Sequence, residues 1–167
     1  MAIILITGGA RSGKSVRAES RARGYSGQPI YIATAEALDA EMSERIALHR
    51  ARRANTWIER EVPLALVEAL DATDGGGARL VDCLTLWLSN LMHANRDWSR
   101  EASRLANALG SQRSPVVLVT NEVGLGIVPD NALGRAFRDA SGLTNQMIAK
   151  VADEVEFVVA GLPMRLK

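Results

Sequence analysis

A glycine-rich loop near the start of the chain limits the fold more than any other feature. Residues 8–15 match the pattern G-x-x-x-x-G-K-[S/T], and they directly follow the apolar run of residues 3–7. In this pattern the glycines allow a tight turn whose backbone N–H groups point at phosphate oxygens, and the helix that follows adds the positive end of its dipole. The sequence therefore predicts a buried strand, a phosphate-binding loop and a helix, in that order.

The residue types inside the loop predict a role for its polar positions. In such a loop the lysine, here Lys14, reaches the β and γ phosphates, and the hydroxyl of Ser15 coordinates Mg²⁺. Lys14 is the only lysine before Lys150, which favours a specific role for it. The loop residues predicted to contact a nucleotide are Gly8, Gly9, Ala10, Arg11, Ser12, Gly13, Lys14 and Ser15.

A phosphate loop of this kind works with a carboxylate on the metal side, at the end of a neighbouring strand. Two residues qualify: Asp82 follows the apolar run 79–81, and Glu122 follows the run 116–121. Each has an ordinary alternative role, since Asp82 could cap a helix and Glu122 could be a solvated loop charge. Both interpretations stay open on the sequence.

Short apolar runs alternate with helical patterns along the chain. The expected strands are residues 3–7, 30–34, 79–82, 116–120 and 155–160, with 56–61 as a candidate for a further strand. The expected helices are residues 14–23, 39–53, 63–72, 84–94, 98–109 and 143–152, and residues 73–77 are expected to be an exposed turn. This alternation predicts one α/β domain over residues 1–167, a RecA-like three-layer sandwich around a mainly parallel sheet.

Composition narrows the classes of function. The formal net charge is +1, so no overall field attracts nucleic acid or an anionic membrane. Cys83 is the only cysteine, which excludes an intrachain disulfide and fits a reducing compartment. No apolar run reaches the length of a membrane span, and the opening run is too short for a signal peptide. We expect a cytoplasmic protein that binds neither nucleic acid nor membrane.

One of the two histidines lies in an arginine-rich helical pattern. His49 shares a helical stripe with Met42 and Ile46, and on that pattern alone it could be a packed core side chain. The arginines near it are Arg45, Arg50, Arg52 and Arg53. Such a cluster suits a polyphosphate, and neighbouring cations keep an imidazole neutral and nucleophilic. Both a structural and a catalytic histidine are therefore compatible with the pattern.

Further motifs follow one another along the whole chain. They are residues 31–35, 39–42, 82–87, 120–129, 135–139, 142–145, 152–155 and 161–163, together with Trp57 and Glu61. With the phosphate loop and His49, this ordered set resembles the bifunctional adenosylcobinamide kinase and adenosylcobinamide-phosphate guanylyltransferase family of cobalamin biosynthesis.

The resemblance implies two reactions on one corrinoid substrate. The family phosphorylates the aminopropanol hydroxyl of adenosylcobinamide with ATP or GTP, and then transfers GMP from a second GTP to give adenosylcobinamide-GDP and pyrophosphate. The resemblance also implies that His49 carries GMP as a phosphoramidate, that Mg²⁺ acts in both steps with Ser15 and Asp82 on the metal side, and that the protein is a homotrimer. The nucleotide contacts it implies outside the phosphate loop are Ala33, Thr34, Ala35, Arg50, Ala51, Arg52, Arg53, Glu61 and Asp82.

Two other functions remain compatible with the residues. One is a phosphate-loop kinase with a single activity and a structural His49, and the other is a regulatory module that binds a nucleotide with little or no hydrolysis. For a corrinoid surface, the long glycine-containing loop of residues 121–131 is the candidate. The sequence leaves open whether ATP or GTP is preferred and whether the two steps share one nucleotide pocket.

Overall fold

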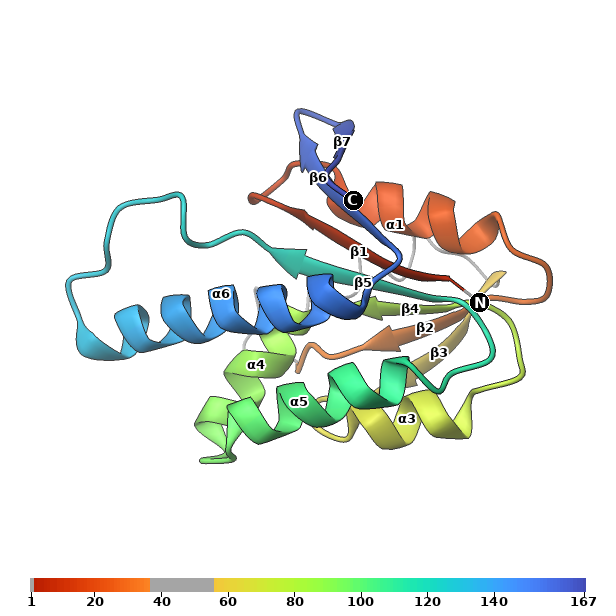
Figure 1. Ribbon diagram of the computed structural model, residues 1–167, viewed down its shortest axis with the longest axis horizontal. Helices are drawn as coiled ribbons and strands as arrows, with labels where there is room; N and C mark the ends of the chain where they lie inside the picture. The colour runs from red at the N-terminus through yellow and green to blue at the C-terminus, as the bar shows by residue number, and fades with distance from the viewer. Residues whose placement is uncertain (1, 37–55) are drawn as a thin grey trace.

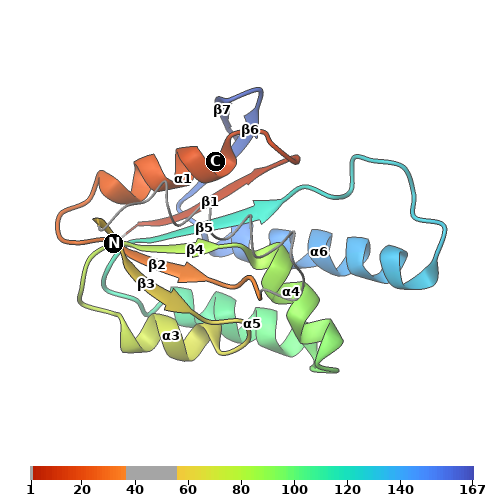
Figure 2. The ribbon, with the colours of Figure 1, turned by 180° about the vertical axis from the view of Figure 1, so that it is seen from behind.

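Seven strands form one sheet, and helices cover both of its faces (Figure 1, Figure 2). The computed structural model describes residues 2–36 and 56–167. The strands are β1 (Ile3–Gly8), β2 (Ile30–Ala33), β3 (Ile58–Glu61), β4 (Arg79–Asp82), β5 (Val116–Asn121), β6 (Glu154–Val159) and β7 (Leu162–Arg165). The helices in those two segments are α1 (Lys14–Arg23), α3 (Leu66–Ala72), α4 (Leu84–His93), α5 (Trp98–Leu109) and α6 (Ala132–Val151).

The strands lie in the order β3-β2-β4-β5-β1-β6-β7. All neighbouring strands are parallel except β6 and β7. Strand β1 has a parallel neighbour on each side, so that Gly8 at its end lies opposite Asn121 of β5 and Val158 of β6. Because parallel strands end at the same edge of a sheet, the loops that follow β1, β2, β4, β5 and β6 meet there. The predicted α/β fold with a mainly parallel sheet is confirmed.

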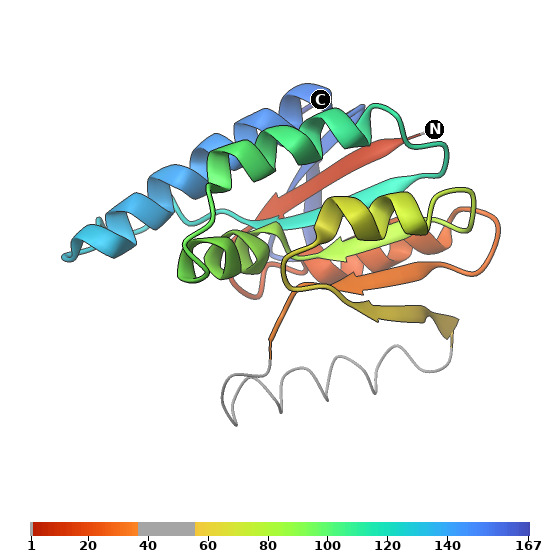
Figure 3. The ribbon, with the colours of Figure 1, turned by 90° about the horizontal axis from the view of Figure 1, so that it is seen from below.

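The central strands are buried on both faces of the sheet. On one face Ile4 and Ile6 of β1 pack in a core with Ala18 of α1. On the other face Leu5 joins a core that contains Trp87 of α4. Helices α3, α5 and α6 lie side by side over this second face (Figure 3). Burial on both faces is the reason that these strands appear in the sequence as continuous apolar runs.

Most of the expected elements occur where the sequence places them. Helices α1 and α5 and strand β4 have the predicted bounds. Strands β1, β2 and β5 and helix α4 differ by one residue at one end, β6 is shifted by one residue, and β3 lies within the candidate strand at 56–61. The expected helix 39–53 lies outside the described residues. Across the segments that are described, no helix combines the length and hydropathy that a membrane span requires.

Three expectations were wrong in their bounds or missed an element. Helix α6 begins at Ala132 and not at 143, because Asn131 caps it by accepting a hydrogen bond from the Gly134 backbone N–H at 2.7 Å. Helix α3 begins at Leu66 and not at 63. Strand β7 was not predicted; it contains Pro163 and is an exposed edge strand, where proline is tolerated.

The turn of residues 73–77 is less exposed than the sequence predicts. Its last residue, Gly77, is buried against the loop before β2, and a Cβ on Gly77 would collide with the carbonyl oxygen of Gln28. Glycine is therefore required there for a close approach of two backbones. The two glycine-containing loops at this end of the sheet pack against each other.

A fully buried arginine joins this turn to the loop before β5. The guanidinium of Arg79 donates to Asp74 at 2.8 Å, to Gln112 Oε1 at 2.9 Å and to the Ser114 carbonyl at 2.9 Å. Burial of Asp74 acts to raise its pKa, but hydrogen bonds from Arg79 and from the Ser114 and Arg113 backbone outweigh it and lower the pKa. The stabilisation from Asp74 is therefore complete above the ordinary carboxyl pKa of about 3.9 and is lost as pH falls through the lowered value.

We predict that Arg79→Met lowers the free energy of unfolding by about 3–5 kcal/mol, because it leaves the buried partners of Arg79 unsatisfied. Arg113 is the matched control, since it binds the same carboxylate at 3.0 Å but its side chain is 79% exposed. Arg113→Met should cost at most about 1 kcal/mol. Urea unfolding measures both, and equal losses in the two variants would contradict the assignment of Arg79 as the anchor.

Candidate nucleotide site

The phosphate loop joins the end of β1 to the start of α1. Two of its glycines are required by the geometry. A Cβ on Gly8 would lie 2.5 Å from the Val158 carbonyl oxygen, and Gly13 has a left-handed φ of 95° immediately before α1. Gly13 has no side chain that could cap the helix, so the first N–H groups of α1 are available to an anion. The predicted strand, loop and helix are present in the predicted order.

Lys14 lies inside the loop that precedes it. The side chain is buried, and its ammonium donates a hydrogen bond to the Gly9 carbonyl at 3.0 Å. Ser15 is the next residue and lies in the first turn of α1. A phosphate group entering the loop would meet backbone N–H groups, a lysine ammonium and a hydroxyl, which together match the needs of a triphosphate.

Helix α1 is anchored to β6 by ion pairs. Arg17 binds Glu156 in a bidentate arrangement, with both distances at 2.8 Å, and Arg21 binds Glu156 at 2.6 Å and Glu154 at 3.0 Å. The hydrogen bond from Arg17 lowers the pKa of Glu156 despite the opposing effect of burial. These pairs lie one and two turns beyond Lys14 and fix the direction of the helix whose N-terminus faces the loop.

Asp82 ends β4, which is separated from β1 by β5 alone. The Tyr31 hydroxyl donates to Asp82 Oδ2 at 2.5 Å, and the Tyr31 ring in turn packs edge-on against Trp57 at a centroid distance of 5.7 Å. The carboxylate is therefore held in one orientation at the sheet edge where the phosphate loop begins. Its neighbour Cys83 is buried; burial and the Asp82 charge raise the pKa of the thiol to about 12, so Cys83 stays protonated.

The ends of β2 and β3 lie beside Asp82. In the sheet register Ala33 is opposite Asp82 on one side and Glu61 on the other. Thr34 connects the end of β2 to the segment after β4. Its hydroxyl donates to the Cys83 carbonyl at 2.8 Å, and its carbonyl accepts from the Asn90 side chain at 2.8 Å. The structure thus brings together the predicted contacts Ala33, Glu61 and Asp82, with Thr34 as their support.

Glu122 directly follows β5 and lies next to the first residue of the phosphate loop. Its backbone N–H donates to the Gly8 carbonyl at 3.1 Å, and its carboxylate accepts from the Gly124 N–H at 2.6 Å. Asp82 and Glu122 thus lie at the same sheet edge, and position along the sheet alone does not select one of them as the metal-side group. Within residues 2–36 and 56–167, no group of three or more His, Cys, Asp and Glu side chains is arranged to hold a metal ion.

The predicted residues of the histidine helix cannot be placed. His49 and Arg45, together with the expected contacts Arg50, Ala51, Arg52 and Arg53, lie outside the described residues. Their proposed roles therefore stay predictions.

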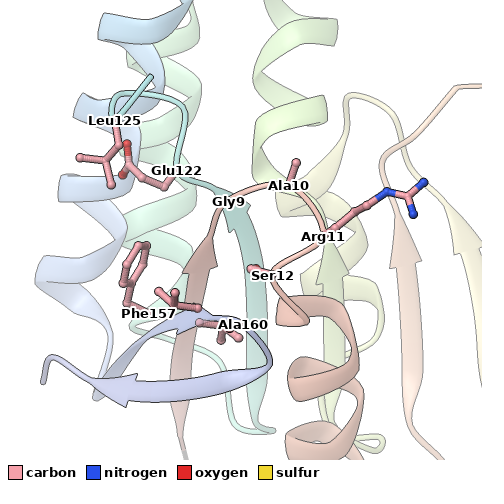
Figure 4. Close-up of a pocket in the computed structure, with 10 residues that line it drawn as sticks. Gly9, Ala10, Arg11, Ser12, Glu122, Leu125, Phe157 and Ala160 are labelled. Atoms are coloured by element: carbon pink, nitrogen blue, oxygen red, sulfur yellow. The ribbon is translucent and has the colours of Figure 1, made fainter. Parts of the chain in front are cut away.

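A cleft of about 350 Å³ opens beside the phosphate loop (Figure 4). Its walls come from three segments, the loop itself, the start of the β5–α6 loop and the end of β6: Gly9, Ala10, Arg11, Ser12, Glu122, Leu125, Phe157, Val158, Val159 and Ala160. The turn after β6 is held to the loop because the Gly161 N–H donates to the Ser12 carbonyl at 2.8 Å. The sequence did not predict that β6 contributes to this cleft. The motif of residues 161–163, which follows β6, was the only signal of that contribution in the sequence.

Solved structures share this fold at low sequence identity. An ATPase from the type III secretion system of pathogenic bacteria superposes with a TM-score of 0.57 at 13% identity, over 98% of this chain and 56% of that one. The P4 protein of bacteriophage phi6, solved in complex with ADP, superposes with a TM-score of 0.50 at 14% identity, over 97% of this chain and 52% of that one. The chain thus spans about half the length of these two proteins, and the likeness confirms the predicted RecA-like fold.

Sequence comparison extends the similarity to whole proteins. The family profile described as cobinamide kinase / cobinamide phosphate guanyltransferase matches residues 4–166. The bifunctional adenosylcobalamin biosynthesis protein CobP of Pseudomonas aeruginosa is 50% identical over 169 residues, covering 98% of this chain and 96% of that protein. The corresponding protein CobU of Escherichia coli is 42% identical over 181 residues, covering 99% of each. The chain therefore belongs to the cobinamide kinase / cobinamide phosphate guanylyltransferase family, the bifunctional enzymes of cobalamin biosynthesis.

Proposed function

We propose that the chain phosphorylates the aminopropanol hydroxyl of adenosylcobinamide with ATP or GTP, and then transfers GMP from GTP to that phosphate, releasing pyrophosphate and giving adenosylcobinamide-GDP. The observation that carries the kinase half is the geometry of the phosphate loop, with Lys14 buried inside it and the uncapped N-terminus of α1 facing it. Membership of the family supports the guanylyltransferase half. We propose that residues 1–167 act as one domain.

The loop and Lys14 supply positioning and charge for both transfers. Phosphoryl transfer needs little covalent help from a protein, so catalysis comes mainly from donors that stabilise charge on the transferring group. The N–H groups of the loop and the Lys14 ammonium are such donors, and the ion pairs of Arg17 with Glu156 hold them in place. The same loop would bind the β and γ phosphates of GTP during guanylyl transfer.

Mg²⁺ fits the groups at the sheet edge. Hydroxyl and carboxylate oxygens are ligands that Mg²⁺ prefers, and it commonly uses one or two protein oxygens with phosphate oxygens and water. Ser15 in the first turn of α1 and Asp82, oriented by Tyr31, are the residues that would hold it. The ion supplies neutralisation of phosphate charge.

His49 is proposed as the nucleophile for guanylyl transfer. Its imidazole would attack the α phosphate of GTP and displace pyrophosphate, and the phosphate of the corrinoid would then displace the histidine. Ala33, Thr34, Ala35 and Glu61, with Arg50, Ala51, Arg52 and Arg53, are the proposed further nucleotide contacts. The clustering of Ala33, Glu61 and Asp82 at neighbouring strand ends supports a nucleotide on this side of the loop.

We predict that GTP labelled on the α phosphate labels the protein covalently, in a bond that is stable in alkali and lost in acid. His49→Ala should abolish the label. The matched control is His93→Ala: His93 lies on the exposed end of α4, where Nδ1 bonds the Ser89 carbonyl at 2.8 Å, and its loss should leave labelling unchanged. An unlabelled wild type, or equal labelling of His49→Ala, would remove the histidine mechanism.

Lys14→Ala should reduce phosphorylation of adenosylcobinamide by at least about 100-fold, because one donor to the transferring group is lost. Lys150→Ala is the matched control, since Lys150 is exposed in the last turn of α6 and should be dispensable. Turnover with γ-labelled ATP measures both variants, and circular dichroism checks that they are folded. Full turnover by Lys14→Ala would exclude the phosphate loop from the kinase step.

A homotrimer in the cytoplasm is the proposed working form. Large apolar side chains are exposed on the later part of the β5–α6 loop and the start of α6, among them Ile127 at 97% and Leu133 at 65%. Exposed apolar groups gathered in one segment favour burial by another protein surface, and in the proposed homotrimer that surface would be a second copy of the chain. The buried thiol of Cys83 fits a reducing compartment.

We predict a mass in solution of about three times the 18.0 kDa of one chain, measured by light scattering. Ile127→Asp should shift the protein towards the monomer, because a charge would be buried between copies. Leu162→Asp is the comparison variant, because it introduces the same charge at another exposed apolar side chain, on β7. A monomeric wild type would contradict the trimer, and a trimeric Ile127→Asp would remove the β5–α6 loop from the interface.

A further inference from the structure

The cleft of Figure 4 lies next to the phosphate loop, but it is not the place where the phosphates are proposed to bind. Its walls contain Gly9 to Ser12 but none of Lys14, Ser15 and Asp82, the residues proposed to hold the triphosphate and its metal. A cleft of about 350 Å³ is at the lower end of the range for small-molecule sites, and one in this place borders the loop that holds the β and γ phosphates. A group bound there lies next to the phosphoryl group that is transferred.

The cleft has one carboxylate and several apolar walls. Figure 4 shows Glu122 and Leu125 on one side of the space and Phe157 on another. Phe157 is half-buried and Val158 is buried, so this wall is both apolar and fixed. Among the residues described, the Glu122 carboxylate accepts a single hydrogen bond, from Gly124. It therefore keeps acceptor capacity for a ligand.

A ring of side chains fixes the residue before Glu122. The Asn121 N–H donates to the Thr85 hydroxyl at 2.7 Å, and Thr85 lies 3.3 Å from the Thr120 hydroxyl. Thr120 donates to Asn145 Oδ1 at 2.8 Å, and Asn145 Nδ2 donates back to the Asn121 carbonyl at 3.5 Å. Because the Thr120 hydroxyl donates its proton to Asn145, the proton between Thr85 and Thr120 comes from Thr85, and each donor in the ring has one acceptor.

This ring holds both backbone groups of Asn121, and the Glu122 N–H is bonded to Gly8. The backbone at Glu122 is therefore held rigidly next to the phosphate loop, although Glu122 itself belongs to the long loop between β5 and α6. A group placed with this accuracy beside a phosphate site is suited to orienting a reactant. Thr85, Thr120 and Asn145 are positioning residues for it.

We propose that this cleft receives the hydroxyl-bearing arm of the acceptor in the kinase step, and that Glu122 is the catalytic base. The proposal rests on the proposed kinase function. The hydroxyl oxygen forms a bond to the γ phosphorus, the bond from that phosphorus to the β–γ bridging oxygen breaks, and the nucleoside diphosphate leaves. The hydroxyl proton passes to the Glu122 carboxylate.

The size and lining of the cleft agree with an arm and not with a whole macrocycle. About 350 Å³ admits a short aliphatic alcohol, and the apolar side chains of Phe157 and Val159 would contact its carbon atoms. The body of a large acceptor would then remain outside, over the exposed side chain of Leu125. The location of Glu122 on the acceptor side leaves Asp82 as the metal-side carboxylate.

The test compares Glu122→Gln with Glu68→Gln in the full chain, using γ-labelled ATP and cobinamide. Loss of a general base should lower kcat by at least about 100-fold while the dissociation constant of ATP changes little. Glu68 is an exposed carboxylate on α3, paired only with Arg104 in the described residues, and its variant should retain wild-type kcat.

A second variant tests the cleft without touching the carboxylate. Leu125→Arg changes a side chain that is 81% exposed, so folding should be unaffected, and it should raise the KM for cobinamide about tenfold with an unchanged KM for ATP. Wild-type kcat in Glu122→Gln, weakened ATP binding in that variant, or an unchanged cobinamide KM in Leu125→Arg would each overturn the proposal. A wild-type protein that does not phosphorylate cobinamide at all would instead overturn the proposed function.

Discussion

The backbone hydrogen bonds around the end of β1 are the constraint on which the site depends. Strand β1 places Gly8 between β5 and β6, and the loops that follow β5 and β6 form hydrogen bonds directly to the phosphate loop. The Glu122 N–H binds the Gly8 carbonyl, and the Gly161 N–H binds the Ser12 carbonyl. Backbone hydrogen bonds from both neighbouring loops therefore hold the phosphate loop, and the first N–H groups of α1 remain for a ligand.

Charged side chains do two different jobs in this fold. Arg79 is buried and Asp74 is partly buried at the end of the sheet away from the site, where they join two loops. Arg17 pairs with Glu156 close to Lys14, where the pair fixes a helix that must face an anion. In both cases the carboxylate is stable because each of its oxygens accepts hydrogen bonds. The cations proposed to act on phosphate are thus separate from those that hold the structure.

Prediction from the sequence was most accurate where local rules are strong. The glycine pattern placed the phosphate loop, and the helical patterns gave the bounds of α1 and α5. In the structure Asp97 caps α5 by accepting a hydrogen bond from the Arg100 N–H. Prediction was least accurate where contacts between elements decide whether an element forms or where it begins. Strand β7 exists because it pairs with β6, and α6 begins at Ala132 because the Asn131 side chain accepts a hydrogen bond from the Gly134 N–H.

By itself the sequence determined the fold class, the position of the phosphate loop, the identity of its lysine and the family, because each depends on residues that are adjacent or in fixed order. Only the tertiary structure decided that Glu122 and not Asp82 lines a cleft beside the loop, and that β6 contributes Phe157 to that cleft. Those relations join residues far apart in the chain. They follow from the strand order, which is set by the packing of whole elements and not by any local pattern.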